Sequence, residues 1–209
     1  MREPENIRAV ENLSIHWMGF IFCPYSPRYV STVPAYLPSR CKRVGVFVDA
    51  KFSEILKRTR DFCLDIIQLH GSEDPYYIER LLSLLPTHVQ VMKMLPIATE
   101  EDLRNTDAYA PLVNYFLFET KSLQTGDYYG GSGKKFDWNI LAAYQGKKPF
   151  LLSGGIGPDD VSRLRTFFSA DNGSVAANCI GIDLNSRFEI KPAIKDVSAL
   201  QQFLSQPLL

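Results

Sequence analysis

The sequence predicts an α/β fold in which short parallel strands alternate with helices. Short apolar runs recur at intervals of roughly 23 to 35 residues, and amphipathic segments fill the intervals between them. Most of the runs are apolar throughout rather than alternating, which is typical of parallel strands that are covered on both faces. The seven expected strands are Trp17–Phe22, Arg43–Val48, Ile66–Leu69, Val89–Met94, Tyr115–Phe118, Phe150–Ser153 and Ile180–Leu184.

Amphipathic segments between these runs predict the helices. Asp74 followed by Pro75 is typical of an N-cap with proline in the first turn, and Gly157-Pro158 opens a later helix in the same way. One more helix is expected before the first strand, where apolar residues recur on one stripe. The expected helices are Glu3–Leu13, Phe52–Phe62, Pro75–Leu85, Glu100–Ala108, Pro158–Phe168 and Ala193–Leu204.

The composition predicts a single domain over residues 1–209 with a large core, because 45% of the residues are hydrophobic. Lys and Arg together number 23, as do Asp and Glu, so no global charge draws the protein to nucleic acid or to a membrane. The four cysteines show no CxxC spacing and no metal-ligand pairing with the three histidines. The polar start does not resemble a signal peptide, and no apolar run is long enough to span a bilayer. We therefore expect a cytoplasmic protein with reduced thiols and with neither a metal nor an organic cofactor.

Two glycine clusters follow late strands and predict a binding site for a phosphate ester. The first is Gly130-Gly131-Ser132-Gly133, and the second is Ser153-Gly154-Gly155. Glycines at strand ends let backbone N–H groups approach an anion closely, and a helix N-terminus that follows adds a favourable dipole. An open dinucleotide-binding sheet would carry its glycine motif after the first strand, so the late position favours a barrel. The expected partner is therefore a small phosphorylated molecule.

Further segments stand out along the chain, and they are Met18-Gly19-Phe20-Ile21-Phe22, Ser26-Pro27-Arg28-Tyr29-Val30, Val44-Gly45-Val46-Phe47-Val48, Gln68-Leu69-His70-Gly71, residues 130–138, Leu152-Ser153-Gly154-Gly155 and Ile182-Asp183-Leu184-Asn185-Ser186. In this order they resemble the phosphoribosylanthranilate isomerase family of tryptophan biosynthesis, whose members are TIM (β/α)8-type barrels. The resemblance covers almost the whole chain. It implies an Amadori rearrangement of N-(5-phosphoribosyl)anthranilate, in which the ribose ring opens and a proton moves to give the ketone. Such a reaction needs a general acid and a general base rather than a metal or cofactor.

The resemblance also assigns substrate-binding residues. Arg28 would hold the anthranilate carboxylate, which suits a planar guanidinium, unless it is a solvated loop arginine. His70, at the end of a strand, would contact the substrate or give polar support to its neighbours. The family holds its phosphate group in the loops after the last two strands, and one earlier loop also approaches the substrate; the alternative for the glycines is simple turn formation. The corresponding residues are Gly154, Gly155, Asn185 and Ser186 in the late loops and Gly131, Ser132 and Gly133 in the earlier one.

The proton-transfer residues correspond less completely. The family's general acid is an aspartate at the end of its sixth strand, where this sequence has Glu119, and a displacement of about 1 Å can lower a rate roughly a hundredfold. Asp127 is the alternative carboxylate. The family's general base is a cysteine at the end of its first strand, and this sequence begins after that point. Cys23 could replace it, although a small apolar filler is the simpler interpretation of this residue.

The first barrel strand is therefore expected to be missing from the chain as given, and three explanations are open. Met1 could be an internal start of a complete isomerase, or the chain could be a shortened paralogue that binds a phosphosugar with little or no turnover. A related phosphosugar barrel enzyme is disfavoured, because the required lysines and metal-binding histidines are absent. An uncovered strand edge would lower stability, or favour a homodimer over a monomer. Lys93 is expected in the lower barrel beside a carboxylate, and Arg187 would add charge near the phosphate or narrow its loop.

Overall fold

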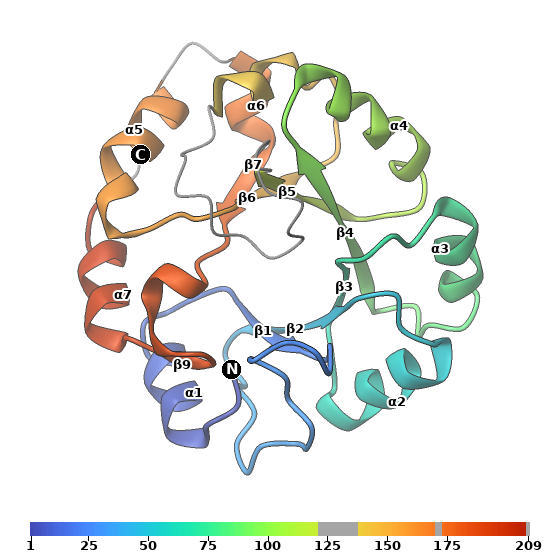
Figure 1. The fold of residues 1–209 in the computed structure, drawn as a ribbon, viewed down its shortest axis with the longest axis vertical. Helices are drawn as coiled ribbons and strands as arrows, with labels where there is room; N and C mark the ends of the chain where they lie inside the picture. Colours follow the sequence, from blue (N-terminus) through green and yellow to red (C-terminus); the bar gives the residue numbers. More distant parts are fainter. Residues whose placement is uncertain (121–137, 170–172, 208–209) are drawn as a thin grey trace.

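The computed structural model describes residues 1–120, 138–169 and 173–207. In this part of the chain, seven parallel strands form one curved sheet in which each strand pairs with the next along the sequence (Figure 1). This order confirms the α/β fold class and all seven predicted strands. The strands of the sheet are β1 (Trp17–Ile21), β2 (Lys42–Phe47), β3 (Ile66–Leu69), β4 (Gln90–Ile97), β5 (Tyr115–Thr120), β6 (Phe150–Ser153) and β7 (Cys179–Ile182), and a separate hairpin is formed by β8 (Glu189–Lys191) and β9 (Ile194–Lys195).

Helices lie around the outside of the curved sheet (Figure 1). The predicted N-cap of a helix at Asp74 is confirmed, because its carboxylate accepts a hydrogen bond from the Tyr77 N–H at 2.7 Å. Within the described residues, no helix is long and apolar enough to cross a membrane. The α-helices are α1 (Pro4–Glu11), α2 (Phe52–Phe62), α3 (Pro75–Leu82), α4 (Thr106–Tyr109), α5 (Val161–Ser169), α6 (Gly173–Asn178) and α7 (Val197–Leu204), and the 3-10 helices are η1 (Glu100–Asn105), η2 (Trp138–Ala143), η3 (Pro158–Asp160) and η4 (Ser186–Phe188).

The predicted helix over Ala193–Leu204 begins too early. Its first residue lies in a turn and the next two form β9, which pairs with β8 in an antiparallel hairpin. Ala193 has a φ of 70°, which a right-handed helix does not allow. The helix α7 begins only after Asp196, whose carboxylate accepts a hydrogen bond from the Ala199 N–H at 3.0 Å. The hairpin thus occupies the segment between β7 and the last helix.

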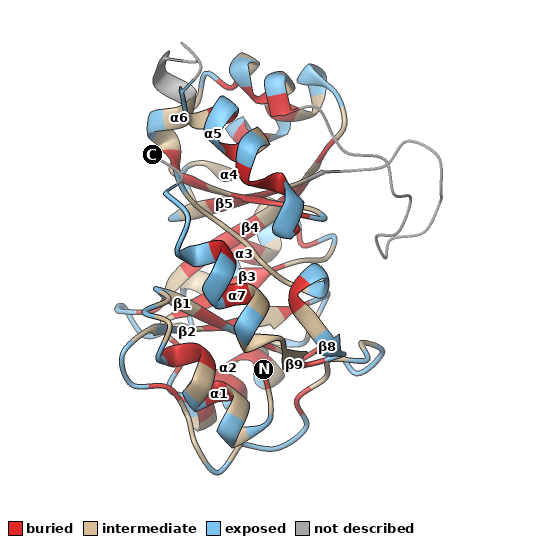
Figure 2. Cartoon of the chain, turned by 90° about the vertical axis from the view of Figure 1, so that its left-hand side faces the viewer, coloured by how far each residue is buried: buried red, intermediate tan, exposed pale blue. Residues whose placement is uncertain are grey.

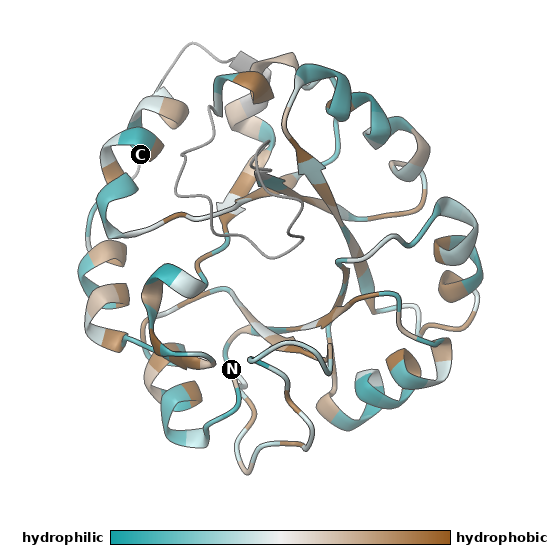
Figure 3. Ribbon diagram, in the orientation of Figure 1, coloured by the Kyte–Doolittle hydropathy of each residue, from teal (hydrophilic) through white to brown (hydrophobic). Residues whose placement is uncertain are grey.

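The strands bury residues on both faces, as their continuous apolar character predicts. Val44, Ile66, Met92 and Leu117 come from four strands and form a small cluster of their own. Adjacent positions on the same strands belong to the larger cluster, which also includes helix residues. Because successive side chains of a strand point to opposite faces, the small cluster fills the inside of the curved sheet and the larger one lies under the helices. Buried residues follow the strands in Figure 2, and the hydrophobic ones can be traced in Figure 3.

β1 and β7 are the two end strands of the sheet, and no described ladder pairs them with each other. Contacts outside the ladders join the segments at these two ends instead. The Met1 nitrogen donates to the Gly19 carbonyl of β1 at 2.9 Å. Asn6 of α1 exchanges two hydrogen bonds, of 2.9 and 2.8 Å, with the backbone of Lys195 in β9. The N-terminal helix therefore bridges toward the hairpin that follows the last strand.

Candidate active site

His70 and Glu119 meet at the carboxyl edge of the sheet. His70 directly follows β3 and Glu119 lies near the end of β5, so the two side chains reach toward each other across β4. The His70 Nε2 atom is 3.1 Å from a Glu119 carboxylate oxygen. The side chains are 29% and 37% exposed, respectively, which leaves both open to a ligand. The sequence predicted each residue separately, and the structure brings them together.

Gln68 sets the orientation of this histidine. Its Nε2 lies 2.8 Å from His70 Nδ1, and Gln68 is itself buried in β3. An amide nitrogen can only donate, so Nδ1 accepts and the ring proton resides on Nε2. The Nε2–H of His70 then donates a hydrogen bond to the Glu119 carboxylate. A carboxylate held in this way, and still open to solvent, is suited to exchange a proton with a bound molecule.

A second carboxyl group, that of Asp183, lies on the same edge. It follows β7, and its Oδ2 is 3.1 Å from the hydroxyl of Ser153. Ser153 in turn lies beside Glu119 in the register between β5 and β6. Burial raises the pKa of Asp183 above its ordinary value, and this effect outweighs the Lys195 charge and the Ser153 hydrogen bond. Asp183 is not among the site residues that the sequence predicts, although an acidic residue that ends an apolar strand is a usable signal.

The loops after β6 and β7 lie against each other. Gly154 and Gly155 follow β6 with φ of 102° and 66°, a conformation that favours glycine. A Cβ added at Gly155 would meet nothing within 4 Å, whereas one at Gly157 would lie 3.1 Å from Nε of Arg187. The exposed Arg187 therefore packs on the β6 loop. Asn185 and Ser186, the other two residues predicted for these loops, stand at the start of η4.

Arg28 lies in the loop after β1 and is not a solvated arginine, because its side chain is only 22% exposed. Its guanidinium forms an ion pair with Glu189 of β8, with a shortest distance of 2.6 Å. Burial alone would raise the pKa of Glu189, but the Arg28 hydrogen bonds and the Lys195 charge outweigh burial and hold that pKa below its ordinary value. The sequence did not predict this partner, which is 161 positions away.

Lys93 does not project into the barrel, contrary to expectation. It lies on β4 between Met92 and Met94, which pack in the inner cluster, so its own side chain points to the helix side. There the ammonium is 2.9 Å from the Glu73 carboxylate and donates to the Gly71 carbonyl at 2.6 Å. The predicted neighbouring carboxylate is therefore present. This pair anchors the loop that begins with His70.

Other predicted residues contribute less to the described site. Cys23 is buried just after β1, and no described side-chain contact joins it to His70 or Glu119. Asp127 lies outside the described residues, and so do the predicted loop residues Gly131, Ser132 and Gly133. Within the described part of the chain, no group of His, Cys, Asp and Glu side chains is arranged to hold a metal ion.

A cavity of about 1110 Å³ lies at the opposite edge of the sheet, near the amino ends of β1 to β4. Its lining includes Arg40, Cys41 and Asp65, and none of the candidate site residues contributes to it. Burial raises the pKa of Cys41 to about 11, so its thiol stays protonated near neutral pH. In barrels of this type, the chemistry takes place at the carboxyl ends of the strands. The cavity is therefore separate from the candidate site.

The fold and the site together define a class: a βα-barrel with a polar, carboxylate-bearing carboxyl edge. Comparisons with known proteins narrow this class. The family model described as N-(5'-phosphoribosyl)anthranilate (PRA) isomerase matches residues 2–206. The chain therefore belongs to the N-(5'-phosphoribosyl)anthranilate isomerase family.

Individual relatives agree with this assignment. The N-(5'-phosphoribosyl)anthranilate isomerase of Phocaeicola vulgatus is 48% identical over 99% of this chain and 94% of the relative. That of Parabacteroides distasonis is 42% identical over the whole chain and 90% of the relative. Among solved structures, the phosphoribosyl anthranilate isomerase of Thermotoga maritima superposes with a TM-score of 0.79 at 28% identity, covering 98% of this chain and 93% of the other.

Proposed function

We propose that the protein catalyses the Amadori rearrangement of N-(5'-phosphoribosyl)anthranilate to the carboxyphenylamino-deoxyribulose phosphate, a step of tryptophan biosynthesis. The observation that carries this proposal is the Glu119–His70 pair at the carboxyl edge of a chain that belongs to the isomerase family. The reaction converts an aldose derivative into a ketose and proceeds entirely by proton transfers. It therefore requires a positioned acid and base, which side chains can supply.

Glu119 acts as the general acid in this proposal. Its carboxyl group donates a proton to the oxygen of the ribose ring, so that the ring opens to a Schiff base. His70 holds that carboxyl group through Nε2, with Gln68 fixing the ring from the other side. Asp183, whose carboxylate accepts a hydrogen bond from Ser153, is assigned to accept a second one from a sugar hydroxyl. Cys23 as the base that removes the proton from the second ribose carbon stays a prediction, and its burial and lack of a described contact to Glu119 do not favour it.

The two ends of the substrate define the binding roles. Arg28, with its guanidinium held in the loop after β1, is assigned to the anthranilate carboxylate. The phosphate group is assigned to the loops after β6 and β7. Support for this comes from the left-handed backbone of the glycines and from the open space beside Gly155, where N–H groups could approach an anion. The residues of these loops are Gly154, Gly155, Asn185 and Ser186.

The test is the loss of anthranilate-type fluorescence as purified protein consumes the substrate. We expect turnover by the wild type and a decrease in kcat of about 10²–10⁴-fold for Glu119→Gln, the usual contribution of a general acid. Glu119→Asp should retain more activity than Glu119→Gln because it keeps the carboxyl group. The matched control is Glu101→Gln, since Glu101 is 69% exposed and pairs only with a surface arginine in the described structure.

Two results would contradict the proposal. Activity of Glu119→Gln within threefold of wild type would remove Glu119 from the reaction. A wild type that binds the substrate without consuming it would favour the alternative, a paralogue that only binds a phosphosugar.

A further inference from the structure

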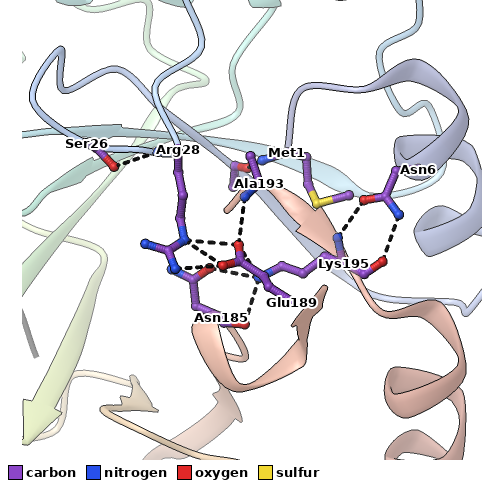
Figure 4. Close-up of polar contacts among 9 residues, drawn as sticks. Met1, Asn6, Ser26, Arg28, Asn185, Glu189, Ala193 and Lys195 are labelled. Carbon is purple, nitrogen blue, oxygen red and sulfur yellow. Dashed lines mark hydrogen bonds and ion pairs between the residues drawn. The ribbon is translucent and has the colours of Figure 1, made fainter. Parts of the chain in front are cut away.

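The Glu189 carboxylate is fully engaged by protein groups. Its side chain is 4% exposed and lies between the loop after β1 and the β8–β9 hairpin (Figure 4). It accepts hydrogen bonds from Arg28 Nε at 2.8 and 3.0 Å and from Arg28 Nη2 at 2.6 Å. The Ala193 N–H at 3.2 Å and the Lys195 ammonium at 3.4 Å complete the set. A carboxylate surrounded in this way serves the protein and is not available to a ligand.

This pairing uses only one edge of the Arg28 guanidinium. Glu189 occupies the edge formed by Nε and Nη2, and no partner of Nη1 is found among the described residues. The second edge, formed by Nη1 and the remaining Nη2 hydrogen, presents two parallel N–H groups, the geometry that binds a carboxylate through both oxygens. Because the first edge is fixed, the direction of the second is fixed as well.

Glu189 lies between two cations. Its carboxylate forms ion pairs with both Arg28 and Lys195, so its single charge is shared between them. Lys195 also donates to the backbone oxygen of Asn185 at 3.0 Å and to its side-chain oxygen at 2.8 Å (Figure 4). Asn185 belongs to the loop assigned to the phosphate. The same carboxylate therefore connects the residue assigned to one end of the substrate with a residue assigned to the other.

We propose that Glu189 is a positioning residue that orients Arg28 toward the carboxylate of the substrate. This inference rests on the proposed function, which assigns Arg28 to that carboxylate. It predicts that Glu189 contributes to substrate selectivity although it does not touch the substrate. Removing its charge lets the guanidinium rotate, so the carboxylate-bearing substrate loses an aligned partner and a substrate without that group loses little.

The experiment compares N-(5'-phosphoribosyl)anthranilate with N-(5'-phosphoribosyl)aniline, which lacks the carboxylate. For Glu189→Gln we expect KM for the anthranilate substrate to rise about tenfold while kcat changes less than threefold. The kcat/KM for the aniline substrate should stay within threefold of wild type. The double variant Arg28→Ala/Glu189→Gln should be no more impaired than Arg28→Ala alone, because both act on one contact. Glu101→Gln again serves as the control.

Each other outcome decides against the inference. An equal loss of kcat/KM for both substrates would show that Glu189 only stabilises the fold. A lower KM for the anthranilate substrate would show that Glu189 competes with the substrate for Arg28. If Glu189→Gln does not fold, the same comparison of the two substrates is made with Glu189→Asp, whose carboxylate lies one methylene closer to the backbone. A wild type that turns over neither substrate would overturn the proposed function itself, and this result differs from the two outcomes above, which concern the variants.

Discussion

Replacing Lys93 by methionine tests the buried ion pair beneath the His70 loop. Lys93 and Glu73 are 3% and 1% exposed at their side chains. Removing one partner of such a pair leaves a buried charge without compensation, which typically costs about 3–5 kcal/mol. Glu73 keeps two hydrogen bonds of 2.9 Å, from the N–H groups of Asp49 and Gly71. We therefore expect Lys93→Met to lose about 3 kcal/mol of unfolding free energy, at the lower end of this range.

Urea unfolding followed by circular dichroism at 25 °C measures this loss. At roughly 2–4 °C per kcal/mol for a chain of this size, the midpoint of thermal unfolding should fall by about 6–12 °C. The control is Lys57→Met, which removes an exposed ammonium from an ion pair with Asp61 and should cost at most about 0.5 kcal/mol. Adding Glu73→Gln to Lys93→Met should recover at least about 1 kcal/mol, because the uncompensated charge is gone.

The reasoning is refuted if Lys93→Met and Lys57→Met destabilise the protein equally. It is also refuted if Glu73→Gln adds its full cost to that of Lys93→Met, since the two side chains would then act independently.

Two further predictions concern stability. Burial would raise the pKa of Glu11, but hydrogen bonds from Tyr36 and from the backbone at positions 39 and 40 hold it below its ordinary value of 4.5. The ionised Glu11 carboxylate therefore stabilises the fold above that value, and this contribution is lost as the pH falls through the lowered pKa. In urea unfolding, Glu11→Gln should cost about 1.5–3 kcal/mol at pH 7 and progressively less below pH 4.5. A cost that does not change with pH would contradict this prediction. Cys63 is the C-cap residue of α2 and has a φ of 47°, a conformation that favours glycine. Cys63→Gly should therefore raise the urea midpoint by the equivalent of about 0.5–1 kcal/mol, whereas Ser83→Gly, at the end of α3 with a φ of −66°, should lower it. Equal effects of the two substitutions would show that the backbone conformation does not determine the change in stability.

The strands were predictable because their signal is local. A buried parallel strand is apolar at nearly every position, and each such run became a strand of the sheet. The segment before α7 was not predictable in the same way. Its apolar and basic residues fit a helix, whereas the φ of 70° at Ala193 and the pairing of β9 with β8 make it a hairpin. The acidic cap at Asp196 was the available signal for the true helix start.

The site was predictable as a set of residues but not as a set of contacts. His70 and Glu119 each stand at a strand end, which sufficed to select them, and strand order then brings them together. The partner of Arg28 could not be found in this way, because Glu189 is far away in sequence and sits in a hairpin that local patterns do not predict. Lys93 illustrates a third case: its face of β4 follows from alternation with Met92 once the strand register is known.

The ion pair between Arg28 and Glu189 also has a mechanical consequence. In a barrel closed by backbone ladders, the hydrogen-bond register fixes the circumference. Here Arg28 follows one end strand of the sheet and Glu189 follows the other, so this pair is a clasp across the seam that no described ladder closes. Ligand binding at Arg28 and the separation of the two end strands should therefore be coupled. A ligand that stabilises the Arg28–Glu189 ion pair should slow amide exchange in β1 and β7 more than in the central strands.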